Sequence, residues 1–187
     1  MSHGLTPSQT VGPFYWGTLV STCRCDFAPP GVAGERVELV LTLHDVAGAV
    51  VPDGIFELWQ ANSHGRYNHP DDRRNLPLDA GFEGFGRAST DAGGAAHFAT
   101  VKPGPVPWPQ GGQQAPHINV SIFARGLLNR LATRLYFEGD PALAEDPVLK
   151  MVEPARRDTL IARRDAQGAW HLPIHLGGPR ETVFFDI

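Results

Sequence analysis

Lys102–Gly126 reads KPGPVPWPQGGQQAPHINVSIFARG, and this stretch decides the fold of the chain. Its first half holds four prolines and three glycines between Pro103 and Gly112. Proline fixes φ and lacks an N–H, so this half is predicted to be an ordered surface loop, not a helix or an inner strand. From His117 on, polar and apolar side chains alternate. This period of two predicts a strand over 117–124 with its polar residues on one face.

The chain on both sides of this stretch alternates short apolar runs with turn residues. Runs of this kind are typical of strands separated by tight turns. The segments 84–90 and 95–100 flank Asp91-Ala92-Gly93-Gly94 and are expected to form a hairpin. The other predicted strands are 37–43, 55–60, 131–137, 170–176 and 182–187. A mainly β fold therefore follows, a β-sandwich or related barrel with long loops.

One helix stands out in the second half of the chain. Glu153-Pro154 places a proline in a first helical turn, and Leu160 and Ile161 give the segment an apolar side before Arg163-Arg164. One or two short helices are expected in all.

Residues 1–35 form a poorly periodic N-terminal arm. It carries the breaker pair Gly12-Pro13 and then three consecutive aromatic residues, Phe14, Tyr15 and Trp16. Leaving three aromatic side chains in water is costly, so the arm is expected to pack on its own domain or on a neighbouring chain.

Composition excludes several classes of protein. The net charge of -4 and pI near 6.0 argue against nucleic acid as a partner. No apolar run approaches the ~20 residues of a membrane helix, and the first residues lack the apolar core of a secretory signal. Cys23 and Cys25 are too close for an unstrained bridge, which favours reduced thiols over a metal pair lacking a second half. A cytoplasmic protein is the expectation.

Few polar residues could meet in a site. Tyr67 lies in a loop, His117 and Asn119 on the predicted strand, and Arg125 beyond it. A mononuclear metal needs about three or four converging donors, and neither zinc-like spacing nor a nucleophile elbow is present. From these residues alone, His117 is better interpreted as a hydrogen-bonded structural histidine.

An ordered set of motifs resembles the intradiol ring-cleaving dioxygenases, and among them the protocatechuate 3,4-dioxygenases built from related α and β chains. The motifs run from residue 6 to the C-terminus: TPSQTVGPF (6–14), ELWQAN (57–62), FGR (85–87), KPG (102–104), PHIN (116–119), TRLYF (133–137) and ETVFFD (181–186). The resemblance implies a β-sandwich core of the intradiol type over 36–187, preceded by an arm over 1–35 that packs on the partner chain.

The same resemblance implies where iron should be held. Members of the family bind Fe(III) through two tyrosines and two histidines, and those positions fall here on Tyr67, Val106, His117 and Asn119. An arginine expected just upstream of the histidine pair falls on Gln114. Valine has no donor atom and asparagine is a weak neutral ligand for a hard ferric ion. The resemblance therefore implies an iron-free α chain with no catalytic residue of its own, with Fe(III) bound by a homologous β subunit.

Substrate-binding roles also come from the resemblance. Arg125, Thr10, Gly12 and Pro13 match α-chain positions that line the cavity of the adjoining β chain, where a cation can receive the ring carboxylate. Tyr67 and His117 would then be vestigial. The implied activity is O2-dependent cleavage of 3,4-dihydroxybenzoate to 3-carboxy-cis,cis-muconate, a step of aromatic catabolism in the β-ketoadipate pathway.

Two alternatives stay open at this point. The chain could be a self-sufficient enzyme with iron in a rearranged site of Tyr67, His69 and His117. It could also be a metal-free β-sandwich that binds a ligand or a partner and has no role in ring cleavage.

Overall fold

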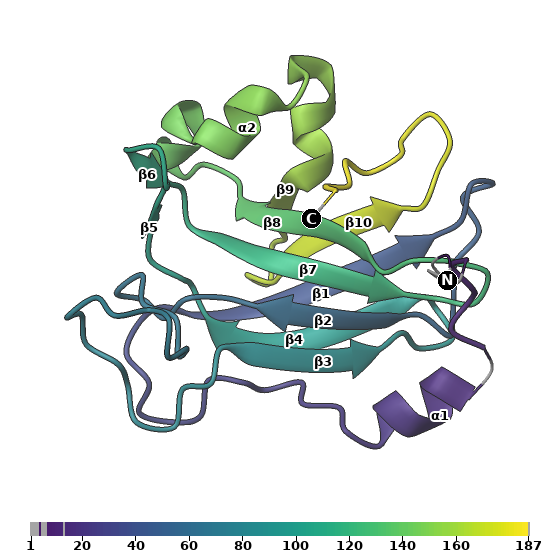
Figure 1. Cartoon of the computed structure of the whole chain (residues 1–187), viewed down its shortest axis with the longest axis horizontal. Coiled ribbons are helices and arrows are strands. Elements are labelled where there is room, and N and C mark those ends of the chain that lie inside the picture. Colours follow the sequence, from purple (N-terminus) through teal and green to yellow (C-terminus); the bar gives the residue numbers. More distant parts are fainter. Residues whose placement is uncertain (1–3, 5–6, 13, 187) are drawn as a thin grey trace.

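Two layers of β-strands face each other across an apolar core, with short helices at opposite ends (Figure 1). The computed structural model describes residues 4, 7–12 and 14–186. The strands of the described chain are β1 (Arg36–His44), β2 (Ile55–Trp59), β3 (Phe85–Ser89), β4 (Ala95–Val101), β5 (Val106–Pro107), β6 (Gln113–Gln114), β7 (His117–Phe123), β8 (Leu131–Phe137), β9 (Ile161–Arg164) and β10 (Trp170–His175). The helices are α1 (Phe14–Val20), α2 (Pro147–Met151) and the 3-10 helices η1 (Pro141–Glu145) and η2 (Pro154–Leu160).

The two layers are joined at both edges. One layer has the order β3-β2-β7-β8 and the other β10-β1-β4, and β9 pairs with β8 in parallel and with β10 in antiparallel orientation. At the opposite edge, Arg24 exchanges two backbone hydrogen bonds with Arg87 of β3. Ala99 of β4 then donates to the Cys25 carbonyl and accepts from the Phe27 N–H. The predicted β-sandwich is confirmed, and residues 24–27 of the arm belong to it.

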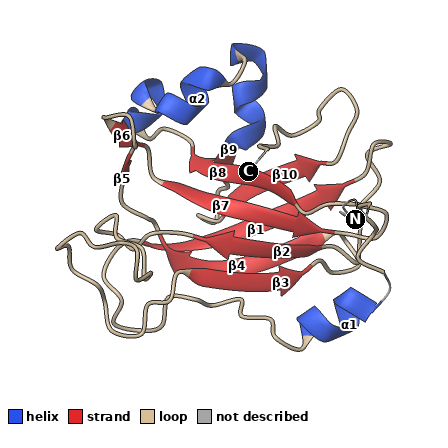
Figure 2. Ribbon diagram, in the orientation of Figure 1, coloured by secondary structure: helices blue, strands red, loops and turns tan. Residues whose placement is uncertain are grey.

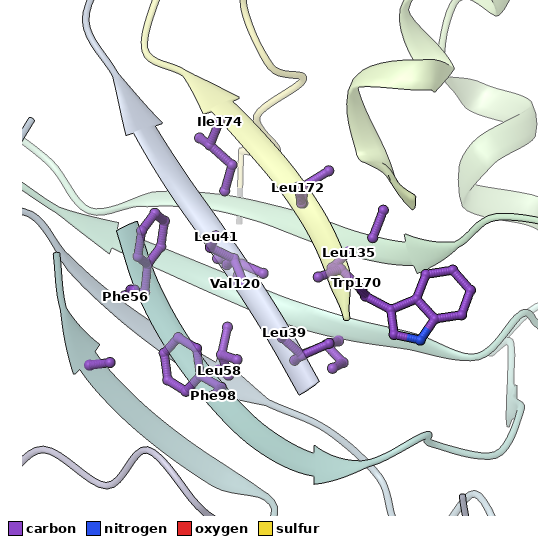
Figure 3. Packing of buried hydrophobic residues seen from close by; sticks show 14 of the residues in the cluster. Leu39, Leu41, Phe56, Leu58, Phe98, Val120, Leu135, Trp170, Leu172 and Ile174 are labelled. Carbon is purple, nitrogen blue, oxygen red and sulfur yellow. The ribbon is translucent and has the colours of Figure 1, made fainter. Parts of the chain in front are cut away.

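The core lies between the layers. β1 alternates buried and more exposed residues along its length, so every second side chain points inward. Leu39 and Leu41 meet Phe56 and Val120 from the facing layer (Figure 3). Burying a side chain of this size is worth ~1.5–3 kcal/mol, so this interleaved set holds the sandwich together.

The predicted hairpin of 84–90 with 95–100 is wrong in its pairing. The turn itself forms: the Asp91 N–H donates to the Ala95 carbonyl at 2.8 Å, and Gly94 has a φ of 73°. Yet β3 pairs with β2, and β4 pairs with β1. The turn carries the chain from one layer to the other, because both strands bury a face in the core between the layers.

The predicted helix over 153–164 is also partly wrong. Pro154 opens η2 as expected, but the helix ends at Leu160. Ile161 and Ala162 then pair in parallel with Tyr136 and Phe137 of β8. Pairing with the free edges of β8 and β10 is more favourable for this short segment than continuing the helix.

Other differences concern short elements. Residues 182–186 are extended but form no strand, and single hydrogen bonds hold them, such as Phe185 N–H to the Ala132 carbonyl at 2.8 Å; residue 187 lies outside the described chain. The proline-rich loop contains the small ribbon of β5 and β6. Helices α1, α2 and η1 come in addition to the one predicted, and all are short (Figure 2). No helix in the described part of the chain is long and apolar enough to cross a membrane.

Candidate functional site

A cleft of about 900 Å³ opens at the start of β7, beside the β5–β6 ribbon. Its lining residues are Trp59, Tyr67, His69, Asp71, Asp72, Arg73, Arg74, Val106, Pro107, Gln114, His117 and Arg134. Tyr67, Val106 and His117 therefore share this cleft, as the expected metal positions would require. Asn119 lies just beyond it and lines a neighbouring groove.

Two loops are clamped together to form one wall of the cleft. The Gly104 N–H donates to the Asn62 carbonyl at 2.9 Å. Gly65 has a φ of 75°, and a Cβ there would collide with the Pro105 carbonyl oxygen. Only glycine permits this approach, which brings the loop of Tyr67 against the loop of Val106.

Tyr67 is held as a neutral phenol. Its ring stacks on Trp59 with centroids 5.8 Å apart and planes 15° from parallel. Its backbone N–H donates to the Asp72 carboxylate at 2.8 Å. Burial raises the pKa of the Tyr67 hydroxyl, against a smaller opposite effect of the Asn119 side chain. The hydroxyl is therefore protonated at neutral pH, and binding a metal as a phenolate would require loss of this proton.

His117 is held as a neutral imidazole. The ring is buried, and Nδ1 lies 2.8 Å from the Ala115 carbonyl oxygen, which requires the proton on Nδ1. Burial, and after it the positive charge of Arg134, lowers the pKa of His117 to about 4. This is the hydrogen-bonded structural histidine expected from the residues alone.

The remaining positions have structural partners. Val106 is buried and pairs with Gln114 across the β5–β6 ribbon. The Gln114 side chain donates to the Pro107 carbonyl at 3.0 Å and accepts from Arg134. Asn119 donates to the Trp59 carbonyl over a long 3.4 Å.

Arg134 is the residue that the sequence interpretation missed. It lies opposite Asn119 in the β7–β8 register. Its Nη1 donates to Gln114 Oε1 at 2.8 Å and to the Tyr136 hydroxyl at 3.2 Å. The alternation of TRLYF, read in register with β7, could have placed this cation beside the expected ligands.

The residues of this cleft do not fit a ferric ion. The four expected positions supply one phenol, one imidazole, an amide and an isopropyl group. A guanidinium stands among them and repels a cation. Within residues 4, 7–12 and 14–186, no group of three His, Cys, Asp or Glu side chains could hold a metal ion without tyrosine ligands.

A second polar group lies at the far end of β7. Arg125 follows the strand, its side chain is 70 % exposed, and it forms an ion pair with Asp53. The Gly126 N–H donates to the Thr10 hydroxyl at 3.2 Å. The Tyr15 hydroxyl donates to the Asp53 carbonyl, and burial raises its pKa to about 12. Arg125 and Thr10 are thus brought together, at the end of the sandwich where α1 lies (Figure 1).

The other two predicted substrate-binding residues are less defined. Gly12 has a φ of 74° and no atom within 4 Å of the position a Cβ would take. Pro13 lies outside the described residues. Within the described chain, no hydrogen bond joins this arm to the cleft at the other end of β7.

Comparison with known proteins gives consistent results. The model of a family described as Dioxygenase matches residues 24–174. The protocatechuate 3,4-dioxygenase alpha chain of Pseudomonas putida is 41% identical, with 97% of this chain and 96% of that protein covered. The beta chain of the corresponding Burkholderia cepacia enzyme is 42% identical over 70% of this chain and 56% of its own length.

Solved structures share the fold. Catechol 1,2-dioxygenase from Pseudomonas arvilla superposes with a TM-score of 0.63 at 24% identity, covering 82% of this chain and 55% of that one. The 3-chlorocatechol 1,2-dioxygenase of Rhodococcus opacus gives 0.61 at 23% identity, over 80% and 62%. The chain thus spans little more than half the length of these solved proteins.

Proposed function

Since this chain belongs to the intradiol dioxygenase family, we propose that it is the iron-free α subunit of a protocatechuate 3,4-dioxygenase. One observation carries the proposal: Val106 and the Arg134 guanidinium occupy the cleft where metal donors are expected. The family is iron-dependent, and in this proposal Fe(III) is bound by a homologous β subunit. The assembled αβ units would cleave 3,4-dihydroxybenzoate with O2 to 3-carboxy-cis,cis-muconate.

Arg125 is the residue through which this chain would act on the substrate. The substrate carries a ring carboxylate, and a guanidinium receives a carboxylate through charge-assisted, often bidentate hydrogen bonds. The exposed side chain of Arg125 can reach across an interface, since its ion pair with Asp53 is near the surface and weak. Its role is binding and orientation of the ring, with no proton transfer.

Thr10, Gly12 and Pro13 are proposed to complete the substrate cavity of the β subunit. The bond from the Gly126 N–H to Thr10 ties this arm to the turn that carries Arg125. A shift of the arm would therefore move the cation as well.

The arm is proposed to pack on the β subunit. Several large apolar side chains in the arm and in the turn after Arg125 are exposed: Val11, Phe14, Trp16 and Leu128. Phe14 is 85% exposed, which is costly unless another surface covers it. Residues 24–27 belong to this chain's own sandwich, so the part available to a partner is the portion before Arg24. The assembly is inferred to work in the cytoplasm.

A self-sufficient iron enzyme is the weaker alternative. Tyr67, His69 and His117 do line one cleft. However, Val106 offers no donor atom, and the Arg134 guanidinium repels a cation there. A purified chain with stoichiometric ferric iron and the matching visible absorption would support this alternative.

Co-expression with a homologous β chain tests the proposal. The two chains should co-purify, contain about one iron per αβ pair, and cleave protocatechuate, and the α chain alone should do none of these. A β chain expressed alone is the matched control and should lose most of the activity. A monomeric chain that fails to co-purify would contradict the proposal.

A further inference from the structure

A cation without a direct counter-ion lies inside the cleft. Arg134 is half-buried, its Nη1 donates to Gln114 and Tyr136, and its guanidinium carbon lies 5.9 Å from the centroid of the Phe185 ring. Across the part of the chain that the structure describes, no carboxylate forms an ion pair with it. A partly desolvated guanidinium in this state is energetically costly, and a bound anion would lower that cost.

The acidic residue nearest along this hydrogen-bond chain, Asp146, already accepts hydrogen bonds from other groups. The Tyr136 hydroxyl, which accepts from Arg134, donates in turn to Asp146 at 3.2 Å. Asp146 also accepts the backbone N–H groups of Ala115, Val148 and Leu149, at 2.7 to 2.9 Å. Asp146 therefore caps helix α2 and holds the backbone at Ala115, just before β7. It makes no direct contact with Arg134, because the Tyr136 hydroxyl lies between them.

The walls of the cleft suit a flat apolar ring. Trp59 and Tyr67 are near-parallel with ring centroids 5.8 Å apart, and the His69 ring meets Trp59 edge-on at 6.5 Å. Val106 lies on the ribbon side of the same cleft. Aromatic faces of this kind favour stacked or edge-on rings, and the volume falls in the range of small-molecule sites.

The two carboxylates at the opening of the cleft, Asp71 and Asp72, do not form ion pairs with Arg134. Asp72 is committed to Arg74, whose Nη2 lies 2.6 Å from it. Asp71 is 84% exposed and lies at the rim, beside His69. Arg73 also lines the cleft. The two carboxylates and two arginines at the opening thus balance in charge, and the remaining charged side chain of the cleft is Arg134.

We propose that this cleft binds a small aryl carboxylate, with the carboxylate on Arg134 and the ring against Trp59 and Tyr67. The proposal concerns binding only and assigns no reaction to the cleft. It lies at the opposite end of β7 from Arg125 and requires no partner subunit.

Fluorine NMR on the purified full-length chain tests the proposal. 4-Fluorobenzoate should bind saturably at one site. 4-Fluorobenzamide, with the same ring and no charge, should bind at least about tenfold more weakly, and acetate, with the charge and no ring, should compete poorly. No saturable binding of 4-fluorobenzoate, or equal binding of the amide, would overturn the proposal.

Two variants locate the site. Arg134→Gln keeps a polar side chain beside Gln114 and should weaken 4-fluorobenzoate binding about 10- to 100-fold. Arg130→Gln removes a charge from an exposed arginine near the start of the same strand and should leave binding within about twofold. Equal loss in both variants would mean a nonspecific charge effect and would overturn the assignment.

A third variant covers the case in which Arg134→Gln does not fold, as judged by circular dichroism. Val106→Phe fills the cleft from the ribbon side without changing charge, and it should abolish binding. Unchanged binding in a folded Val106→Phe chain would place the ligand elsewhere. Since the measurement uses this chain alone, its outcome is separate from whether the chain pairs with a β subunit.

Discussion

The two ends of strand β7 differ in how their polar groups are held. At the His117 end, the side chains of His117, Tyr136 and Asp146 are buried. The imidazole donates to the Ala115 carbonyl, and the Tyr136 hydroxyl donates to Asp146. At the other end, Arg125 is 70% exposed and its partners lie near the surface. The ends are about 25 Å apart at the ~3.3 Å rise of a strand. At the first end a buried hydrogen-bond network surrounds a cleft, whereas at the second end a cation lies exposed at the surface.

The largest effect is expected from Asp146, which supports the buried end. Asp146→Ala would leave three backbone N–H groups and the Tyr136 hydroxyl without their acceptor. We expect a loss of about 3–5 kcal/mol in the free energy of unfolding, measured by urea denaturation. Asp146→Asn keeps one acceptor oxygen and should lose less. A loss below about 1 kcal/mol in the alanine variant would contradict the structural role of this end.

The next largest effect is a pH dependence of the free energy of unfolding, caused by His117. Its pKa is about 4 in the folded chain and near 6.5 unfolded, so between these values the unfolded state binds more protons. Stability should therefore fall as the pH drops from 6.5 to 4, by up to about 3 kcal/mol. His117→Gln should flatten this part of the profile in urea denaturation at pH 7 and 4.5.

His69→Gln is the control for that measurement, because it removes an exposed histidine from the same cleft and leaves His117 in place. Burial lowers the pKa of His175 as well, so His175 contributes in the same direction to every variant. Only the difference between profiles is therefore informative. Identical slopes for His117→Gln and wild type would remove His117 as the cause.

A smaller effect on stability, but a clear one on substrate, is expected at the exposed end. In the assembled enzyme, Arg125→Ala should raise the KM for protocatechuate about tenfold or more, because a charge-assisted contact to the carboxylate is lost. Catechol, which lacks that carboxylate, should be affected far less. Arg125→Lys should recover part of the affinity. Equal changes for both substrates would mean that Arg125 does not contact the carboxylate.

The smallest effect is expected from the ion pair of Arg125 itself. Asp53→Asn should change the free energy of unfolding by less than about 1 kcal/mol, since exposed pairs contribute little. Thermal unfolding of the variant beside wild type measures this. A loss of several kcal/mol would show that this end is as structural as the other.

Local patterns predicted the strands well and their partners poorly. The alternation from His117 to Phe123 gave β7 its correct face, with Ile118, Val120 and Ile122 in the core. The turn Asp91–Gly94 was also correct, but a turn does not determine whether the next strand pairs beside it or in the facing layer. The helix predicted around Leu160 failed for a related reason, because β9 forms only where β8 and β10 leave a gap for it.

The sequence predicted which positions lie in the candidate site, but not the burial and charge that surround them. Motif order placed Tyr67, Val106 and His117 in one cleft. It did not include Arg134, whose importance arises from its register opposite Asn119, a long-range property. The protonation states also escaped sequence interpretation, because burial and a neighbouring guanidinium set them.

The parallel pairing of β1 with β10 has a consequence for how the chain is made. Leu39 lies beside Trp170, so a strand near the start of the chain obtains one of its two neighbours only when the last strand has been synthesised. Contacts so distant along the chain close slowly, and until then the edge of β1 that pairs with β10 lacks its backbone hydrogen-bond partners. We expect the pairing of β1 with β10 to be among the last strand contacts to form during folding.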